Sequence, residues 1–194
     1  GFTLRKGEVL GLAGLQGSGK SEVLHALFGA LEGRAYGTAS LSGALLPLRN
    51  PGESIRRGLV LLTNDRKALA LSPEMSVTHS VSLSSLRSFS NRVGWMDQKE
   101  EMEAVAGVTG GFRLSAPSMD APVRTLSGGN QQKVVVEKWL IRDCDILIFD
   151  EPTRGIDVGA KADIYELMRG WSARGVGILL ITSEMEELLT LSHR

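Results

Sequence analysis

The residues with the clearest capacity for chemistry are eight that follow an apolar run near the start of the chain. Residues 14–21 read GLQGSGKS and satisfy the pattern G-x-x-x-x-G-K-[ST]. They lie between the apolar run EVLGLAGL at 8–15 and a helical pattern that starts at residue 21. A strand, a glycine loop and a helix in this order are typical of a loop that binds phosphate. The candidate binding residues are Gly14, Leu15, Gln16, Gly17, Ser18, Gly19, Lys20, Ser21 and Glu22.

Backbone geometry explains why such a loop binds phosphate. Glycines let successive N–H groups turn inward around the phosphate oxygens, and the helix that follows adds the positive end of its dipole. Lys20 is expected to reach the β and γ phosphates, and the hydroxyl of Ser21 is expected to ligate Mg²⁺. An ordinary glycine turn with a solvated lysine is the alternative, but it leaves the motifs further along the chain unexplained.

Two adjacent carboxylates come at the end of the apolar run DILIFD at 145–150. Asp150 is the last residue of this run, and Glu151 follows it directly. Ligands of open α/β sheets bind at the carboxyl ends of the strands, so both side chains are expected near the phosphate loop. Asp150 can hold Mg²⁺ through water, and Glu151 can polarise an attacking water. A capping pair at the end of a strand is the structural alternative.

Four short apolar runs predict the strands that position these groups, at 8–15, 58–64, 145–150 and 177–183. Their continuous apolarity is typical of strands in a parallel sheet that is buried on both faces. Helical patterns start at residues 21, 131 and 161. Strands that alternate with helices predict an α/β fold, with a mainly parallel sheet flanked by helices.

Residues 65–125 differ in composition and residue pattern from the rest of the chain. They hold a serine-rich stretch at 77–91 and a polar helix candidate at 97–107, and they lack a strand-like apolar run. We therefore expect a mostly helical insertion at 65–125 between the two parts of the core, 1–64 and 126–194. The serines could mark a flexible linker, but apolar residues recur among them and favour packed structure.

Composition narrows the classes of protein to which the chain can belong. Lys plus Arg and Asp plus Glu both number 22, so the formal net charge is zero and no broad basic surface for nucleic acid is expected. Cys144 is the single cysteine, which excludes an internal disulfide and is typical of a reducing compartment. No apolar run approaches the ~20 residues that span a bilayer, and the first residues lack the apolar core of a signal peptide. A link to a membrane is expected to come through a partner.

Residues 126–140, LSGGNQQKVVVEKWL, resemble the signature sequence of ABC-type ATPases, and the phosphate loop and carboxylate pair flank them in that family's order. The resemblance implies a second phosphate site, built from a serine and N–H groups at a helix N-terminus. In the family this helix faces the nucleotide of the other half of a head-to-tail dimer, so that each ATP lies between two subunits. The signature residues expected to meet the partner's ATP are Leu126, Ser127, Gly128, Gly129, Asn130 and Gln131.

The likeness extends over most of the chain and is weakest at 68–110. PTRGIDVGAKADIYELM after the carboxylates, GEVLGLAGLQGSGKSE and LLTNDRK look like the second nucleotide-binding half of the fused ATPases that drive monosaccharide importers of the ribose, galactose or xylose type. This implies a P-loop ABC ATPase fold with a helical signature subdomain, hydrolysis of ATP with Mg²⁺, and a peripheral place on the cytoplasmic face of the inner or plasma membrane. The implied partners are a second ABC ATPase domain, a membrane permease and, indirectly, a sugar-binding protein. Only 13 residues precede Gly14, so the chain resembles a piece that lacks the family's first strands, including the one with the aromatic residue that stacks on adenine.

Two positions depart from the general ABC pattern. Most members have a histidine after the last core strand, where this chain has Ser183, and none of its three histidines is placed to replace it. The resemblance thus implies a site without a γ-phosphate sensor, and loss of one such donor costs ~10²–10³ in rate. Asn64 and Asp65 stand where a glutamine is usual, and Asp65 could reach Mg²⁺ through water or pair with Arg66. Asp157 is expected at the dimer interface, with a solvated charged turn as the alternative.

The first function hypothesis is an ATP-binding cassette that hydrolyses MgATP to power import of a simple sugar. The second is a catalytically weak, regulatory half whose signature completes the site of its sibling domain. A soluble ABC ATPase of DNA repair or translation is a third, against which the neutral charge and the short spacing from Ser21 to Ser127 argue. Ordinary P-loop kinases and GTPases share the phosphate loop but lack the signature.

Overall fold

The computed structural model describes residues 1–15, 17–63, 70–110, 114–142 and 144–194, which form parts of two compact units. The sheet unit comprises residues 1–64, 144–152 and 165–194, and the helical unit comprises residues 65–143 and 153–164. The sequence groups residues 126–194 with the core, whereas 126–143 and 153–164 belong by their contacts to the helical unit. The expectations for Gln16, Asn64, Asp65 and Arg66 lie outside the described residues.

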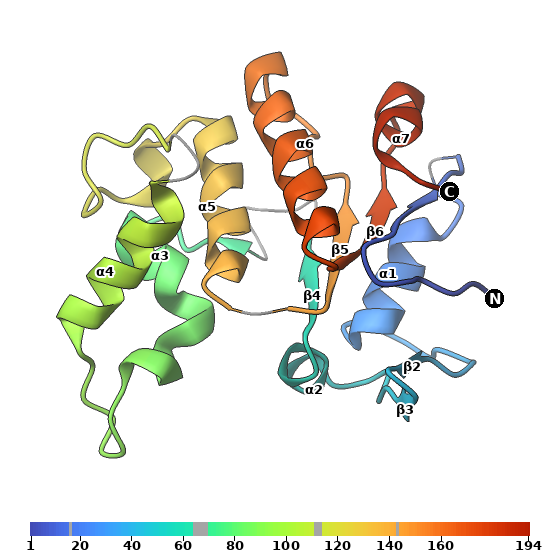
Figure 1. The fold of residues 1–194 in the computed structure, drawn as a ribbon, viewed down its shortest axis with the longest axis horizontal. Helices are drawn as coiled ribbons and strands as arrows, with labels where there is room; N and C mark the ends of the chain where they lie inside the picture. The colour runs from blue at the N-terminus through green and yellow to red at the C-terminus, as the bar shows by residue number, and fades with distance from the viewer. Residues whose placement is uncertain (16, 64–69, 111–113, 143) are drawn as a thin grey trace. The chain divides into compact units, whose positions relative to one another are not determined.

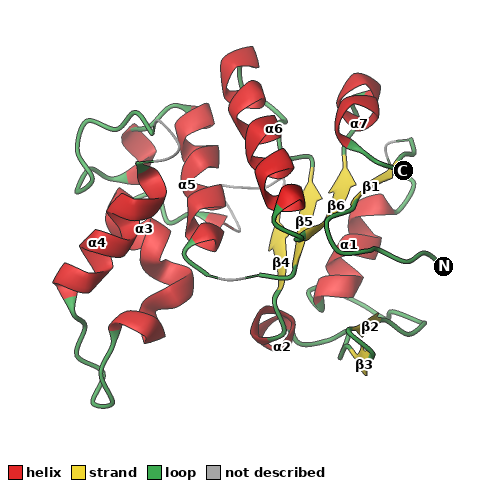
Figure 2. Ribbon diagram, in the orientation of Figure 1, coloured by secondary structure: helices red, strands yellow, loops and turns green. Residues whose placement is uncertain are grey.

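The sheet unit is built on four parallel strands, as the apolar runs predict. Their order is β1 (Val9–Leu12), β6 (Gly177–Ile181), β5 (Ile146–Asp150) and β4 (Leu59–Leu62) (Figure 2). Leu10 and Ile148 both lie opposite Leu179 of β6, which fixes the register of the three strands. Since every strand runs in the same direction, the carboxyl ends of β1 and β5 meet at one edge of the sheet. The phosphate loop and the carboxylate pair follow these two ends.

Helix α1 (Lys20–Phe28) joins the phosphate loop to the core of the sheet unit (Figure 1). Leu24 and Phe28 lie one turn apart and are buried. They belong to a cluster that includes Leu46 and residues of all four strands: Leu10, Leu59, Ile148, Leu179 and Ile181. The helix ends at Gly29, whose φ of 86° lies in the left-handed region that glycine adopts without a Cβ penalty. Burial of its apolar face therefore holds the start of α1 beside the sheet.

The sheet unit also holds a small antiparallel hairpin, β2 (Ser40–Leu41) and β3 (Ala44–Leu45), and the helices α2 (Pro51–Arg56) and α7 (Met185–Leu191). The sequence analysis did not predict these elements. Helix α2 carried a usable signal, since Asn50 caps it by accepting from the N–H of Glu53 at 3.1 Å and proline occupies its first position.

The helical unit is mostly helical where it is described. It contains α3 (Val77–Ser82), the 3₁₀ helices η2 (Leu83–Phe89) and η3 (Val123–Thr125), α4 (Gln98–Thr109) and α5 (Gly128–Leu140). The serine-rich stretch is packed, because it forms α3 and η2. The core of the unit consists of Val77, Val81, Val105, Val123, Leu126 and Val134.

Helix α6 (Val158–Ala173) begins in the helical unit and ends in the sheet unit. Trp171 near its end is 3% exposed, and its ring centroid lies 5.9 Å from that of Phe149 in β5. This tryptophan is therefore a core residue of the sheet unit. None of the helices formed by the described residues is long and apolar enough to cross a membrane.

Candidate functional site

The phosphate loop turns on two glycines that adopt left-handed backbone conformations. Gly17 has φ of 78° and Gly19 has φ of 87°, a region that costs other residues about 1–2 kcal/mol. The N–H of Ser18 donates to the carbonyl of Leu15 at 3.2 Å and closes the turn. Gly19 precedes α1 and no side chain caps the helix there. The first N–H groups of α1 therefore remain available for an anion.

Lys20 lies over this loop. Its ammonium donates a hydrogen bond to the carbonyl of Gly14, six residues before it. A Cβ at Gly14 would lie 2.9 Å from the hydroxyl of Ser18 and 3.2 Å from Cδ of Lys20, so a larger residue there would require these two flexible side chains to shift. Leu15 and Glu22, which the sequence includes in the loop, are exposed. The positive charge of Lys20 is thus held where the loop would receive phosphate.

The structure brings together two of the three predicted magnesium ligands, Ser21 and Asp150, while the third, Asp65, lies outside the described residues. The hydroxyl of Ser21 donates to Oδ1 of Asp150 at 2.9 Å, although 129 residues separate them in the chain. Asp150 is 1% exposed, and its Oδ2 has no hydrogen-bond partner. Burial raises the pKa of the Asp150 carboxyl above its ordinary value, and the hydrogen bond from Ser21 opposes that shift.

This pair fits Mg²⁺. A hydroxyl and a carboxylate are the hard oxygen donors that Mg²⁺ prefers, and the unpartnered Oδ2 leaves the carboxylate free to accept. The part of the chain that the structure describes has no group of three or more His, Cys, Asp and Glu residues that could hold a metal. A site of one hydroxyl and one carboxylate is typical of Mg²⁺ that is completed by phosphate oxygens and water.

Glu151 has a backbone conformation that is rare for its residue type. Its φ is 51°, in the left-handed region, which costs a non-glycine residue about 1–3 kcal/mol. Its N–H donates to the carbonyl of Ile181 at 2.8 Å, and Oε2 accepts from the hydroxyl of Ser183 at 2.9 Å. The last residue of β6, Ile181, and the second residue after it, Ser183, therefore hold the backbone and the carboxylate of Glu151.

Ser183 thus has a contact that the sequence analysis did not foresee. The resemblance treats this position as a missing histidine, whereas the structure gives its hydroxyl a direct bond to Glu151. A serine two residues beyond the end of a buried strand carries no local sign of such a bond. Only the pairing of β5 with β6 shows it.

The signature residues open α5 in the helical unit. Ser127 is the N-cap, and its hydroxyl accepts from the backbone N–H and the side-chain amide of Asn130 at 3.3 and 3.2 Å. Gly129 is buried, and a Cβ there would lie 2.9 Å from Cβ of Ala160. Ser127 and Gly128 are exposed at the N-terminus of a helix of 13 residues.

Two signature residues hold the start of α5 in place through contacts inside the helical unit. Leu126 is 7% exposed and belongs to the core of the unit. The side-chain amide of Gln131 donates to the carbonyls of Val123 and Leu126 at 3.3 and 3.2 Å. The side chains of Leu126 and Gln131 thus fix the segment that leads into α5. Contact with a partner's ATP stays a prediction for all six signature residues.

Asp157 caps the start of α6. Its Oδ1 accepts from the N–H of Ala160 at 2.9 Å, and backbone hydrogen bonds, first of all this one, lower the pKa of its carboxyl. The side chain is exposed. The capping geometry agrees with a charged turn and helix start, and a role for Asp157 at a dimer interface stays a prediction.

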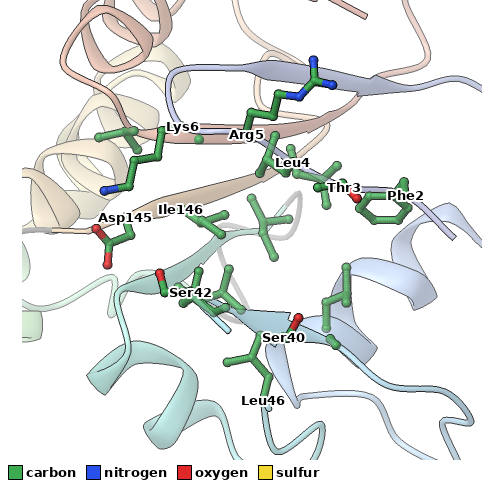
Figure 3. A pocket seen from close by; sticks show the side chains of 18 of the residues that line it. Phe2, Thr3, Leu4, Arg5, Lys6, Ser40, Ser42, Leu46, Asp145 and Ile146 are labelled. Carbon is green, nitrogen blue, oxygen red and sulfur yellow. The ribbon is translucent and has the colours of Figure 1, made fainter. Parts of the chain in front are cut away.

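A cavity of about 690 Å³ in the sheet unit lies away from these groups. Leu59, Ile146 and Gly177, at the amino ends of β4, β5 and β6, contribute to its lining together with residues 1–6 and the β2 strand (Figure 3). The phosphate loop and Asp150 follow the carboxyl ends of the strands. The cavity is therefore not the candidate phosphate site.

A glycine loop at the start of a helix, beside an acidic residue that ends a parallel strand, defines an α/β protein of the P-loop nucleotide-binding class. The sequence matches the ABC transporter family over residues 1–154. The chain belongs to this family, whose ATP-binding cassettes are ATP hydrolases. The resemblance drawn from the motifs is thereby confirmed.

Named relatives agree with this assignment. The chain is 46% identical over 194 residues to a Burkholderia lata protein named as a ribose/galactose/methyl galactoside import ATP-binding protein, and 45% identical over 193 residues to the ribose import ATP-binding protein RbsA of Hahella chejuensis. Each comparison covers the whole of this chain and 38% of the relative, so the chain spans well under half the length of these proteins.

A solved structure shows the same fold. A nucleotide-free ATP-binding cassette from an ABC transporter superposes with a TM-score of 0.81 at 23% sequence identity, over 98% of this chain and 76% of that one. The predicted fold class, an α/β fold of the ABC ATPase type, is confirmed.

Proposed function

We propose that this chain is an ATP-binding cassette that binds and hydrolyses MgATP at a head-to-tail dimer interface and powers import of a simple sugar through a membrane permease. The names of the relatives, which are import ATP-binding proteins for ribose or galactose, support the transport class. The chain would work peripherally on the cytoplasmic face of the membrane. Its partners would be a second ABC ATPase domain, the permease and, indirectly, a sugar-binding protein, with no nucleic acid.

The phosphate loop would bind the triphosphate. The N–H groups that follow Gly17 and Gly19 would surround its oxygens, and Lys20 would exchange its bond to the Gly14 carbonyl for the β and γ phosphates. Ser21 and Asp150 would hold Mg²⁺, which neutralises charge on the phosphates when it is bound. The hydrogen bond between Ser21 and Asp150 is the observation that supports this proposal, because a hydroxyl and a carboxylate that suit Mg²⁺ lie within 2.9 Å of each other beside the loop.

Glu151 would act on the attacking water. A carboxylate oxygen of Glu151 would accept a proton from that water while Ser183 holds the other oxygen, Oε2. The left-handed backbone at Glu151 fixes the direction of the side chain as it leaves β5. A fixed base reduces the reorganisation needed at the moment of reaction.

The N-terminus of α5 would supply the second phosphate site. Gly128 and Gly129 open the helix without side chains that would block an anion, and Ser127 lies beside them. ATP between this helix and the phosphate loop of a partner would stabilise the closed dimer. Loss of the γ-phosphate on hydrolysis would release it.

Equilibrium binding of MgATP to the whole natural protein tests the proposal. Lys20→Ala should weaken binding at this site by about tenfold or more, because a charge-assisted contact to phosphate contributes about 1.5–3 kcal/mol. Lys99→Ala is the control, since it removes the same side chain from an exposed position on α4 where it pairs with Glu103. Equal affinity in wild type and Lys20→Ala would contradict the assignment of the phosphate loop.

A second candidate function is favoured by Ser183. With serine where most members have a histidine, the chain could act as a regulatory half that holds ATP while its signature completes a sibling site. Glu151→Gln in the complete transporter separates the two. A severe loss of ATPase activity indicates that this site hydrolyses, and near-normal activity indicates the regulatory half; Glu186→Gln, an exposed carboxylate on α7, is the control.

A further inference from the structure

Only one of the two carboxylate oxygens of Asp150 accepts a hydrogen bond from the residues proposed above. Its Oδ1 accepts from Ser21, but its Oδ2 is buried and accepts no hydrogen bond. Nε2 of His25, a basic nitrogen, lies 3.9 Å from this Oδ2. His25 is not among the candidate binding residues, and its place in the sequence does not let it replace the histidine that most members have at the position of Ser183.

Helix geometry places this histidine beside the site. Ser21 and His25 are four residues apart on α1, so their side chains lie on the same face of the helix. The hydroxyl of Ser21 reaches one oxygen of the carboxylate and the imidazole of His25 faces the other. The side chain of His25 is 26% exposed, compared with 1% for Asp150, so it lies at the border between the buried carboxylate and solvent.

A hydrogen-bond donor at Oδ2 would offset the unfavourable effect of nearby negative charges on the ionised carboxyl of Asp150. Glu22 and Glu151 are the two other carboxylates whose charge acts on Asp150, and both disfavour its ionised form. A buried polar atom without a hydrogen bond costs about 1–3 kcal/mol. The distance of 3.9 Å is too long for a direct hydrogen bond, and one bridging water or a small rotation of the imidazole would close it.

A single donor does not fix a carboxylate. The bond from the rotatable hydroxyl of Ser21 to Oδ1 is a soft restraint on rotation of the carboxyl plane about the bond to Cβ. A second donor at Oδ2 fixes that plane and therefore the direction of the oxygens offered to a cation. Groups that orient a metal ligand in this way typically change metal affinity by about 10–100-fold.

We propose that His25 is a positioning residue, which orients Asp150 by donating an N–H to its Oδ2 and so strengthens binding of Mg²⁺ with ATP. The proposal rests on the proposed MgATP function. The alternative is a histidine that merely serves the last turn of α1, where its positive form would favour the helix dipole. The two roles differ in one respect: only the first depends on Mg²⁺ and on Asp150.

The test compares ATP binding by the whole natural protein in Mg²⁺ and in EDTA. His25→Leu keeps the approximate volume and removes the donor, so it should reduce the gain in affinity that Mg²⁺ provides by about 10-fold and leave binding in EDTA unchanged. His25→Gln keeps an N–H donor at similar reach and should restore most of that gain. Binding of Mn²⁺ with ATP, followed by the electron paramagnetic resonance of free Mn²⁺, gives a readout that does not require hydrolysis.

The matched control is His79→Leu. His79 Nε2 lies 4.0 Å from Oε2 of Glu101, a buried carboxylate in the helical unit, so this variant removes a histidine–carboxylate pair of the same geometry away from the site. Its Mg²⁺ dependence should equal that of the wild type. In an Asp150→Asn background, His25→Leu should have no further effect on Mg²⁺ dependence, because its target is gone.

Three results would overturn the inference. They are an equal loss of ATP affinity in Mg²⁺ and in EDTA, a full effect of His25→Leu in the Asp150→Asn background, and failure of His25→Gln to bind better than His25→Leu. If the wild type binds no ATP in either condition, the proposed function fails and the inference falls with it. Normal ATP binding that is insensitive to His25→Leu removes the inference alone.

Discussion

At the scale of single residues, the phosphate loop depends on glycine at position 19 for its conformation and not for space. Gly19 has φ of 87°, and a Cβ there would meet nothing within 4 Å. Any effect of a small side chain at this position therefore comes from the left-handed conformation.

Gly19→Ala should weaken ATP binding by several-fold to tenfold, because the cost of about 1–2 kcal/mol for the left-handed conformation shifts the loop away from its binding shape. Isothermal titration with ATP measures this change. Gly94→Ala is a matched control, since Gly94 has φ of 88° with the same open surroundings and belongs to a turn before α4. Equal ATP affinity in Gly19→Ala and wild type would show that the loop tolerates another conformation.

The hydroxyl of Ser183 is expected to matter for hydrolysis more than for binding. Ser183→Ala removes the bond to Oε2 of Glu151, and hydrogen bonds to charged groups contribute about 1.5–3 kcal/mol. Single-turnover hydrolysis should slow by about tenfold or more while the affinity for ATP stays the same. Thr190→Ala, which removes a hydroxyl bonded to the Glu186 carbonyl on α7, should leave both unchanged. A loss of affinity without a loss of rate would contradict this role.

At the scale of elements, α5 combines the exposed signature with a buried acid. Glu137 is 0% exposed and neither of its carboxylate oxygens has a hydrogen bond. Burial raises the pKa of its carboxyl from 4.5 to about 8, and the charge of Lys133 opposes that shift. The folded chain therefore keeps this proton at neutral pH, whereas the unfolded chain loses it.

This proton makes stability depend on pH in a direction that can be tested. The folded-state pKa is above the unfolded one, so Glu137 contributes a free energy of unfolding that falls as pH rises from about 4.5 to about 8, by up to ~1.4 kcal/mol per pH unit. Glu137→Gln cannot ionise and should unfold at a higher temperature than the wild type at pH 8 and at a similar temperature at pH 5. Thermal unfolding at both values of pH measures the difference. Glu166→Gln, an exposed acid on α6, is the control, and an equal gap at pH 5 and pH 8 would refute the assignment.

Secondary structure was predictable from the sequence to different degrees in different elements. The four parallel strands and helices α1, α4, α5 and α6 are confirmed, because each has a long apolar run or a clear helical period. The β2–β3 hairpin has two residues per strand, and α2 and α7 have six and seven residues. Elements this short show too few turns for a periodicity to appear, and their stability comes from packing.

At the scale of the whole molecule, the proposed function needs a second cassette. Ser127→Arg should abolish transport by the complete transporter while ATP binding by this chain stays within about twofold of wild type, because the arginine would fill the space for the partner's phosphate but lies outside the phosphate loop. Uptake of labelled sugar and ATP titration measure the two effects.

The same substitution also removes a helix cap, which contributes about 1 kcal/mol. Ser76→Arg is the matched control, since Ser76 caps α3 in the same unit by accepting from the N–H of His79 at 3.2 Å. Transport by Ser76→Arg should be near normal. Unimpaired uptake by Ser127→Arg would contradict the sandwiched ATP, and equal loss in both variants would assign the effect to stability.

The sequence by itself determined the family, the phosphate loop, the signature and the strands. Each of these is a continuous segment, so its residue types can be read from neighbouring positions in the chain. Glycines at left-handed positions and continuous apolar runs are local features. The tertiary structure alone decided which side chains meet: Ser21 with Asp150, His25 with the other oxygen of that carboxylate, and Ser183 with Glu151. These partners come together because β1, β6 and β5 lie side by side in an order that no local pattern specifies.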